Sequence, residues 1–85
     1  MTTEKIEQYI ERKQHKRTPV NIHFKERRTV TGLFIRDKDY EELKAKNFWR
    51  VVNQEKIKEW EKTNDINLSR VFNGISFTRL SDELE

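Results

Sequence analysis

The sequence predicts a mainly β domain in which an N-terminal helix precedes a small, strongly bent, five-stranded antiparallel barrel. Residues 20–24 alternate apolar and polar side chains, as a half-buried strand does. The β-branched and aromatic stretch 29–35 is interrupted by Gly32, which indicates a bulge or a sharp bend with backbone packed close above it. Hydrophobic residues make up only 33% of the 85 residues, so a closed barrel is the economical way to avoid exposed strand edges.

The first element is an amphipathic helix that begins near Thr3 and ends at Thr18. Thr3 is a suitable N-cap, and apolar residues follow at helical spacing at Ile6, Tyr9 and Ile10. Pro19 disfavours helical backbone at the residue before it. The last turns of this helix are rich in basic residues, which either interact favourably with the helix dipole or form a basic rim for phosphates. These residues are Arg12, Lys13, Lys16 and Arg17.

Between the first two strands, the reversal at 25–28 lacks the turn residues of a two-residue hairpin, so we expect a connection of four or five residues. The polar segment 36–47 is expected to be a long loop or a frayed helix. The next strand covers 48–52.

Residues 54–63 predict a short helix in which Ile57 and Trp60 lie three apart, with Trp60 as a packing anchor rather than a base-stacking platform. Residues 64–65 end this helix. Alternation over 66–72 predicts the fourth strand, 73–74 is the strongest turn signal, and 75–78 completes the last strand. The whole chain is a single domain, with the barrel over 19–80 and a loose acidic tail at 81–85.

Composition restricts the classes of function. The sequence has no Cys, which excludes disulfides and a cysteine nucleophile, and no apolar run that would serve as a signal peptide or a membrane span. A cytoplasmic protein without a membrane partner is expected. The formal charge of +3 favours anionic partners only mildly, because 15 residues are acidic.

Three short motifs carry a resemblance to a known family. The sequence RTPVNIHF at 17–24 is followed by a polar turn and VTG at 30–32, and NGIS stands at 73–76. In this order they resemble the Sm/Lsm superfamily, and in particular its bacterial branch, the RNA chaperone Hfq. The resemblance implies a bent five-stranded barrel whose fourth and fifth strands pair between copies in rings of six or seven, which bind single-stranded RNA around the pore.

Carried over residue by residue, the resemblance implies a nucleic-acid site. Tyr40 stands where Hfq has a base-stacking aromatic residue, and Asp39 flanks the position of the acidic loop residue. Asn73 replaces the pore-side His or Arg and Phe72 replaces a Lys, so the uridine pocket of the family loses its cation. The nucleic-acid-binding residues implied are Tyr40, Asn73, Arg17, Lys16, Lys13 and Asp39.

Other chemistry finds no support in the sequence. The stretch that begins at Asp37 starts like a calcium loop but has Glu42 where glycine is required. His15 and His23 are not spaced as a zinc pair, and His23 is expected to point to solvent. With two glycines there is no phosphate-cradling loop, and no catalytic triad is identifiable. We therefore expect neither an enzyme nor a metal or cofactor site.

Two functions remain open at this point. The first is an Sm-like homo-oligomer, joined through edge strands, that binds single-stranded RNA by base stacking and phosphate neutralisation. The alternative is a protein-interaction or scaffolding barrel that retains the fold without the RNA pocket and uses Trp49, Trp60 and an open strand edge for another protein.

Overall fold

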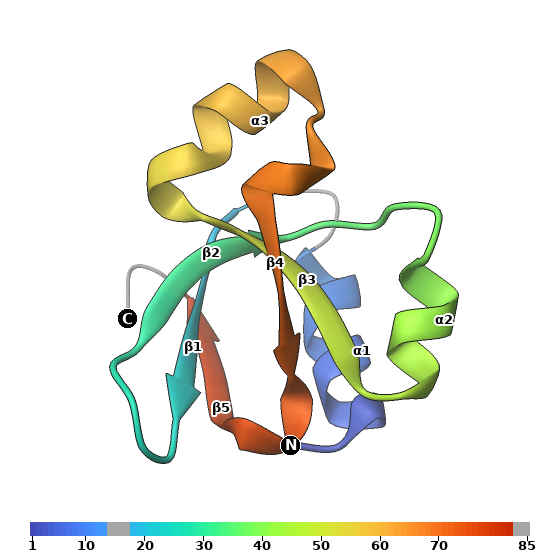
Figure 1. Cartoon of the computed structure of the whole chain (residues 1–85). Coiled ribbons are helices and arrows are strands. Elements are labelled where there is room, and N and C mark those ends of the chain that lie inside the picture. The colour runs from blue at the N-terminus through green and yellow to red at the C-terminus, as the bar shows by residue number, and fades with distance from the viewer. Residues whose placement is uncertain (14–17, 83–85) are drawn as a thin grey trace.

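The computed structural model describes residues 1–13 and 18–82, and it confirms an N-terminal helix followed by a five-stranded antiparallel sheet (Figure 1). The elements are α1 (Thr3–Lys13), β1 (Val20–Phe24), β2 (Val30–Phe34), α2 (Tyr40–Ala45), β3 (Phe48–Asn53), η2 (Gln54–Lys56), α3 (Ile57–Thr63), η3 (Ile66–Leu68), β4 (Ser69–Asn73), η4 (Gly74–Ser76) and β5 (Phe77–Asp82). Thr18 and Pro19 are not helical, while the predicted helical residues 14–17 lie outside the described part. None of the described helices is long and apolar enough to cross a membrane.

The strands are ordered β4-β3-β2-β1-β5 in the sheet. The central hairpin of β1 and β2 is joined by the five residues 25–29, a length within the predicted range. Val20 of β1 pairs with Gly32 of β2 on one side and with Asp82 of β5 on the other. β4 and β5 lie at the two edges and do not pair with each other in the described residues. Backbone hydrogen bonds therefore leave the curled sheet open rather than closing it into a barrel (Figure 1).

The main core lies between α1 and the curled sheet. Ile6 and Ile10, predicted to share a helix face, are buried against Val20 and Ile22, the buried face of β1. The remaining buried members of this cluster come from the other strands and are Trp49, Val51, Phe72, Phe77 and Leu80. The apolar faces that helical and strand periodicity predict therefore pack together in one core.

A second apolar cluster lies on the opposite face of β2 and β3. Leu33, Ile35 and Val52 are buried there, and Ile57 and Trp60 pack against them from α3. The predicted helix over 54–63 is confirmed as η2 followed by α3, with Trp60 as a packing anchor. It ends at Asn64, whose φ of 53° is left-handed, a conformation that asparagine tolerates better than most residues.

Gly32 lies where the backbone of β3 passes close to that of β2. A Cβ at this position would lie 2.6 Å from Val51 Cγ1 and 2.7 Å from the carbonyl oxygen of Val52. The predicted close backbone approach is therefore confirmed, in a strand that curves visibly in Figure 1. The register irregularity of the sheet lies between His23 and Phe24 in the pairing of β1 with β5, and not at Gly32.

The last two strands begin later than predicted. Residues 66–68 form a 3-10 turn because the side chain of Asp65 accepts a hydrogen bond from the N–H of Asn67, 3.0 Å away. Residues 75–76 also belong to a 3-10 turn, η4. The predicted loose tail at 81–85 is wrong for its first two residues: Ser81 is only 4% exposed and pairs with Asn21, and Asp82 pairs with Val20. Residues 83–85 lie outside the described part.

Within segment 36–47, residues 40–45 form α2, and a tight turn that ends at Asn47 follows. Of the two predicted forms, a long loop or a frayed helix, the segment therefore contains the helix. Asn47 is buried and left-handed, with a φ of 63°. Its Oδ1 accepts from Trp49 Nε1 at 2.8 Å, its Nδ2 donates to the Met1 carbonyl at 3.0 Å, and its own carbonyl accepts from Gly74 N at 2.8 Å. One asparagine thereby ties β3, the N-terminal segment and the β4–β5 connection together.

Candidate functional site

Tyr40, the residue predicted to stack on a base, begins α2 and packs against the protein itself. Its ring centroid lies 6.1 Å from that of Trp49 in an edge-on arrangement. The Arg36 guanidinium carbon lies 4.9 Å and the Lys44 ammonium 5.4 Å from the same ring centroid. The hydroxyl is buried without a hydrogen-bond partner among the described residues, and burial raises the pKa of Tyr40. The ring of Tyr40 is therefore engaged in contacts within the protein itself.

Asp39 forms an ion pair with Arg50 rather than standing free. Arg50 Nη2 lies 2.7 Å from Asp39 Oδ2, and Arg50 Nε lies 3.1 Å from both carboxylate oxygens. Arg50 also donates from Nη1 to Ser69 Oγ at 3.2 Å. The hydrogen bonds from Arg50 lower the pKa of Asp39, so this carboxylate anchors the start of α2 to β3 and β4.

The stability contributed by this ion pair should be lost in acid. A carboxyl group whose pKa is lowered on folding stabilises the fold above its unfolded pKa of ~3.9, and the contribution disappears as pH falls through the lowered value. We expect Asp39→Asn to be less stable than the parent at neutral pH, with the difference shrinking towards zero between about pH 5 and pH 2. Urea unfolding midpoints measured across this range test the expectation, and a difference that stays constant with pH contradicts it.

Of the other predicted site residues, Asn73 is the one whose side chain the structure describes, and it is not brought to Tyr40 and Asp39. Asn73 is exposed at the end of β4, where its Oδ1 accepts from the N–H of Ile75 at 3.0 Å and so caps η4. Lys16 and Arg17 lie outside the described residues, as does the side chain of Lys13. The structure therefore places Tyr40 with Asp39 at one end of α2, and Asn73 in a separate turn.

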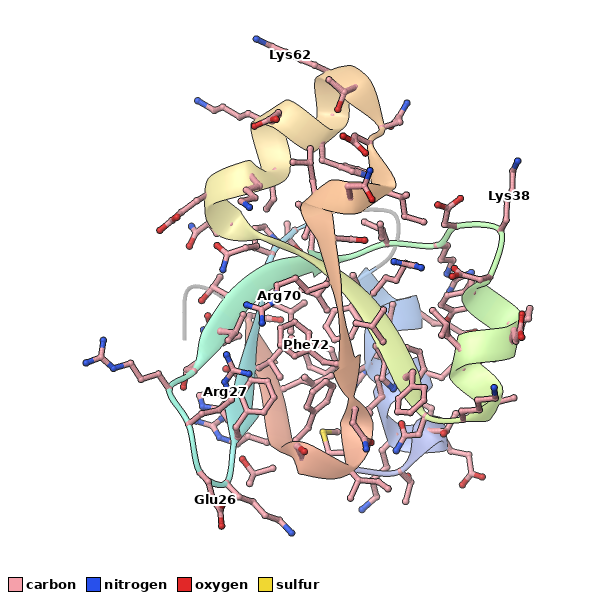
Figure 2. All side chains as sticks on the ribbon, in the orientation of Figure 1. Glu26, Arg27, Lys38, Lys62, Arg70 and Phe72 are labelled. Atoms are coloured by element: carbon pink, nitrogen blue, oxygen red, sulfur yellow. The ribbon has the colours of Figure 1, made fainter. Side chains whose placement is uncertain are left out.

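A different group of side chains forms the best candidate site, between the β1–β2 turn and β4. The Arg27 guanidinium carbon lies 5.0 Å from the ring centroid of Phe24 and 5.6 Å from that of Phe72. The Arg70 guanidinium carbon lies 5.7 Å from the Phe72 centroid. The two rings pack at 5.7 Å from each other. We call Arg27, Arg70, Phe24 and Phe72 the arginine–phenylalanine cluster. Figure 2 labels Arg27, Arg70 and Phe72, which lie between the β1–β2 hairpin and β4.

The arginine–phenylalanine cluster borders a pocket with an apolar floor and a basic rim. The pocket is lined by Arg27, Val30, Val51, Asn53, Arg70 and Phe72. Both arginines are exposed, and within the described residues neither forms an ion pair. Arg50 and Lys44, by contrast, are each paired with a carboxylate. Among the described residues, no carboxylate therefore neutralises the positive charge at this pocket.

The sequence held one signal for this cluster that was missed. Arg70 and Phe72 are two residues apart on a strand and so share a face, a spacing typical of an arginine laid over an aromatic ring. The contribution of Arg27 carried no such signal, because it comes from a turn more than forty residues away.

His23, predicted to point to solvent, is instead half-buried and hydrogen-bonded on the outer face of β1. Its Nε2 lies 2.9 Å from Ser81 Oγ, and its Nδ1 lies 3.3 Å from Thr29 Oγ1. Ser81 is only 4% exposed, so the pair joins β1 to β5 and offers no accessible nucleophile.

Comparisons with models of protein families, with curated proteins and with solved structures find no match for this chain. The likeness to the Sm/Lsm superfamily therefore depends on the three short motifs and on the order of the elements. The candidate site is argued from the chemistry of its own side chains.

Proposed function

We propose that this chain is an Sm-like module that binds single-stranded RNA through the arginine–phenylalanine cluster. The observation that carries the proposal is that two guanidinium groups, Arg27 and Arg70, lie over the ring of Phe72 at the rim of one pocket and form no ion pair with any described residue. Arginine binds phosphate oxygens through a planar fork, and its flat face stacks on nucleobases. Single strands expose both groups at once, since their bases are unstacked.

Assembly into a ring in the cytoplasm belongs to the same proposal. β4 and β5 are the edges of an open sheet, and edges of this kind pair readily with another chain. Val71 and Ile75 are 46% and 66% exposed on and just beyond β4, where a neighbouring copy would cover them. Pairing of β4 with β5 of the next copy would satisfy both edges and complete a barrel, as the resemblance implies. Native mass spectrometry tests this assembly, for which we expect six or seven copies.

Binding should depend on the two arginines and on salt. We expect Arg27→Gln and Arg70→Gln each to lower the affinity for a single-stranded RNA roughly tenfold, equivalent to ~1.4 kcal/mol. The slope of log affinity against log salt should fall by roughly one for each arginine removed, because fewer counterions are released. Fluorescence anisotropy across a salt series measures both quantities.

Arg28→Gln is the matched control for this test. Arg28 is exposed in the same turn as Arg27 but does not line the pocket, so its loss removes the same charge without touching the cluster. Equal losses of affinity in the Arg27 and Arg28 variants would show nonspecific attraction by the whole turn. The proposal would be overturned if the parent protein bound no single-stranded RNA.

A protein-interaction role is the second candidate, and the edge of β4 favours it. Trp49 and Trp60, the anchors expected from the sequence, instead pack in the two apolar clusters. Val71 and Ile75 offer exposed apolar anchors on and just beyond an edge strand, the features that a partner strand uses when it extends a sheet. A monomer in native mass spectrometry that binds no RNA, but forms a defined complex with another protein through Val71, would decide for this role.

A further inference from the structure

The polar side chains that line the pocket are all hydrogen-bond donors. Arg27 and Arg70 carry no acceptor at all. Asn53 accepts from the N–H of Glu55 with its Oδ1 at 3.1 Å, and its NH₂ is a further donor at the pocket. Because donors outnumber acceptors in this lining, a ligand rich in acceptors and negative charge fits it better than a neutral base edge.

The pocket also has a floor. Val51, one of its lining residues, is 1% exposed, and Phe72 is 9% exposed and belongs to the main core. A phosphodiester within a strand must leave its site in two directions, whereas a terminal phosphate enters from one side. A pocket that is closed at its floor therefore suits the end of a chain better than its middle.

From these observations we infer that the pocket binds the terminal phosphomonoester of a single-stranded nucleic acid. Such a group carries a charge of about −1.5 to −2 at pH 7, which two arginines balance, whereas an internal phosphodiester carries a single charge. Its oxygens also accept from guanidinium forks in pairs. This inference rests on the proposed function and narrows it to strands that bear a phosphate at one end.

The test compares oligonucleotides of one sequence that carry a 5′-phosphate, a 3′-phosphate or hydroxyls at both ends. We expect one of the phosphorylated forms to bind the parent protein about tenfold more tightly than the hydroxyl form, since a charged hydrogen-bonded pair is gained. The form that gains identifies the end that enters the pocket. The preference should vanish in the Arg27→Gln, Arg70→Gln double variant and persist in Arg28→Gln. Inorganic phosphate should remove the preference, while sodium chloride at equal ionic strength should lower all affinities alike.

The outcomes separate the two proposals. Tight binding of all three oligonucleotides with equal affinity would overturn the terminal-phosphate inference and leave RNA binding standing. Binding of none of them would overturn both. A preference that survives in the double variant would place the phosphate elsewhere and overturn the inference. Circular dichroism melts of the variants show that each is folded under the assay conditions.

Discussion

Replacing Gly32 by valine is expected to lower the free energy of unfolding by ~3 kcal/mol, and replacing it by alanine by ~2 kcal/mol. A Cβ at this position would lie 2.7 Å from the carbonyl oxygen of Val52, which belongs to the paired backbone of β3. Rotating a side chain does not relieve this contact, so β2 and β3 must separate. In a domain of this size each kcal/mol corresponds to ~4–8 °C in Tm, which thermal unfolding followed by circular dichroism detects easily.

Lys62→Ala serves as the control for the Gly32 variants. Lys62 is exposed in the last turn of α3, so its truncation should change stability by less than ~0.5 kcal/mol. An alanine variant at Gly32 that unfolds at the same temperature as the parent would contradict the close approach of the two strands.

The second large effect is expected at Asn47, whose replacement by alanine should cost ~3 kcal/mol. The Nε1–H of buried Trp49 would lose its acceptor and the Met1 carbonyl its donor, and an unsatisfied buried group costs ~1–3 kcal/mol. The φ of 63° adds up to ~1 kcal/mol, because asparagine tolerates a left-handed backbone better than alanine does.

Two further variants at Asn47 separate these contributions. Asn47→Gly removes the same hydrogen bonds but relieves the backbone, so it should be ~1 kcal/mol more stable than Asn47→Ala. Asn47→Asp keeps an acceptor for Trp49 and should fall between the parent and Asn47→Ala. Chemical denaturation of the four proteins gives the comparison, and equal stability of the alanine variant and the parent would refute the role of the network.

Predictions from the sequence succeeded where a local pattern has one structural outcome. Period-2 alternation in β1, helical spacing in α1 and the lone Gly32 each correspond to the observed burial. They failed where a polar side chain redirects the backbone over two or three residues. Asp65 and Asn73 each cap a 3-10 turn, and these two turns postpone the starts of β4 and β5.

For the candidate site, residue type alone could not distinguish a free side chain from a partnered one. Tyr40 and Asp39 have chemistry suited to RNA, but the fold packs Tyr40 on Trp49 and pairs Asp39 with Arg50. Arg27 resembles its neighbour Arg28 in the sequence, and only Arg27 lies against the two phenylalanine rings.

By itself, the sequence determined the helix-first order, the inward faces of α1 and β1 and the need for glycine at position 32, because these depend on periodicity and on one residue's missing side chain. Only the tertiary structure decided that, among the described residues, β4 and β5 do not pair with each other and that Arg27 meets Arg70 over Phe72. The physical reason is distance along the chain: local propensity acts over a few residues, whereas this pocket is made when the curl of the sheet brings a turn and an edge strand together.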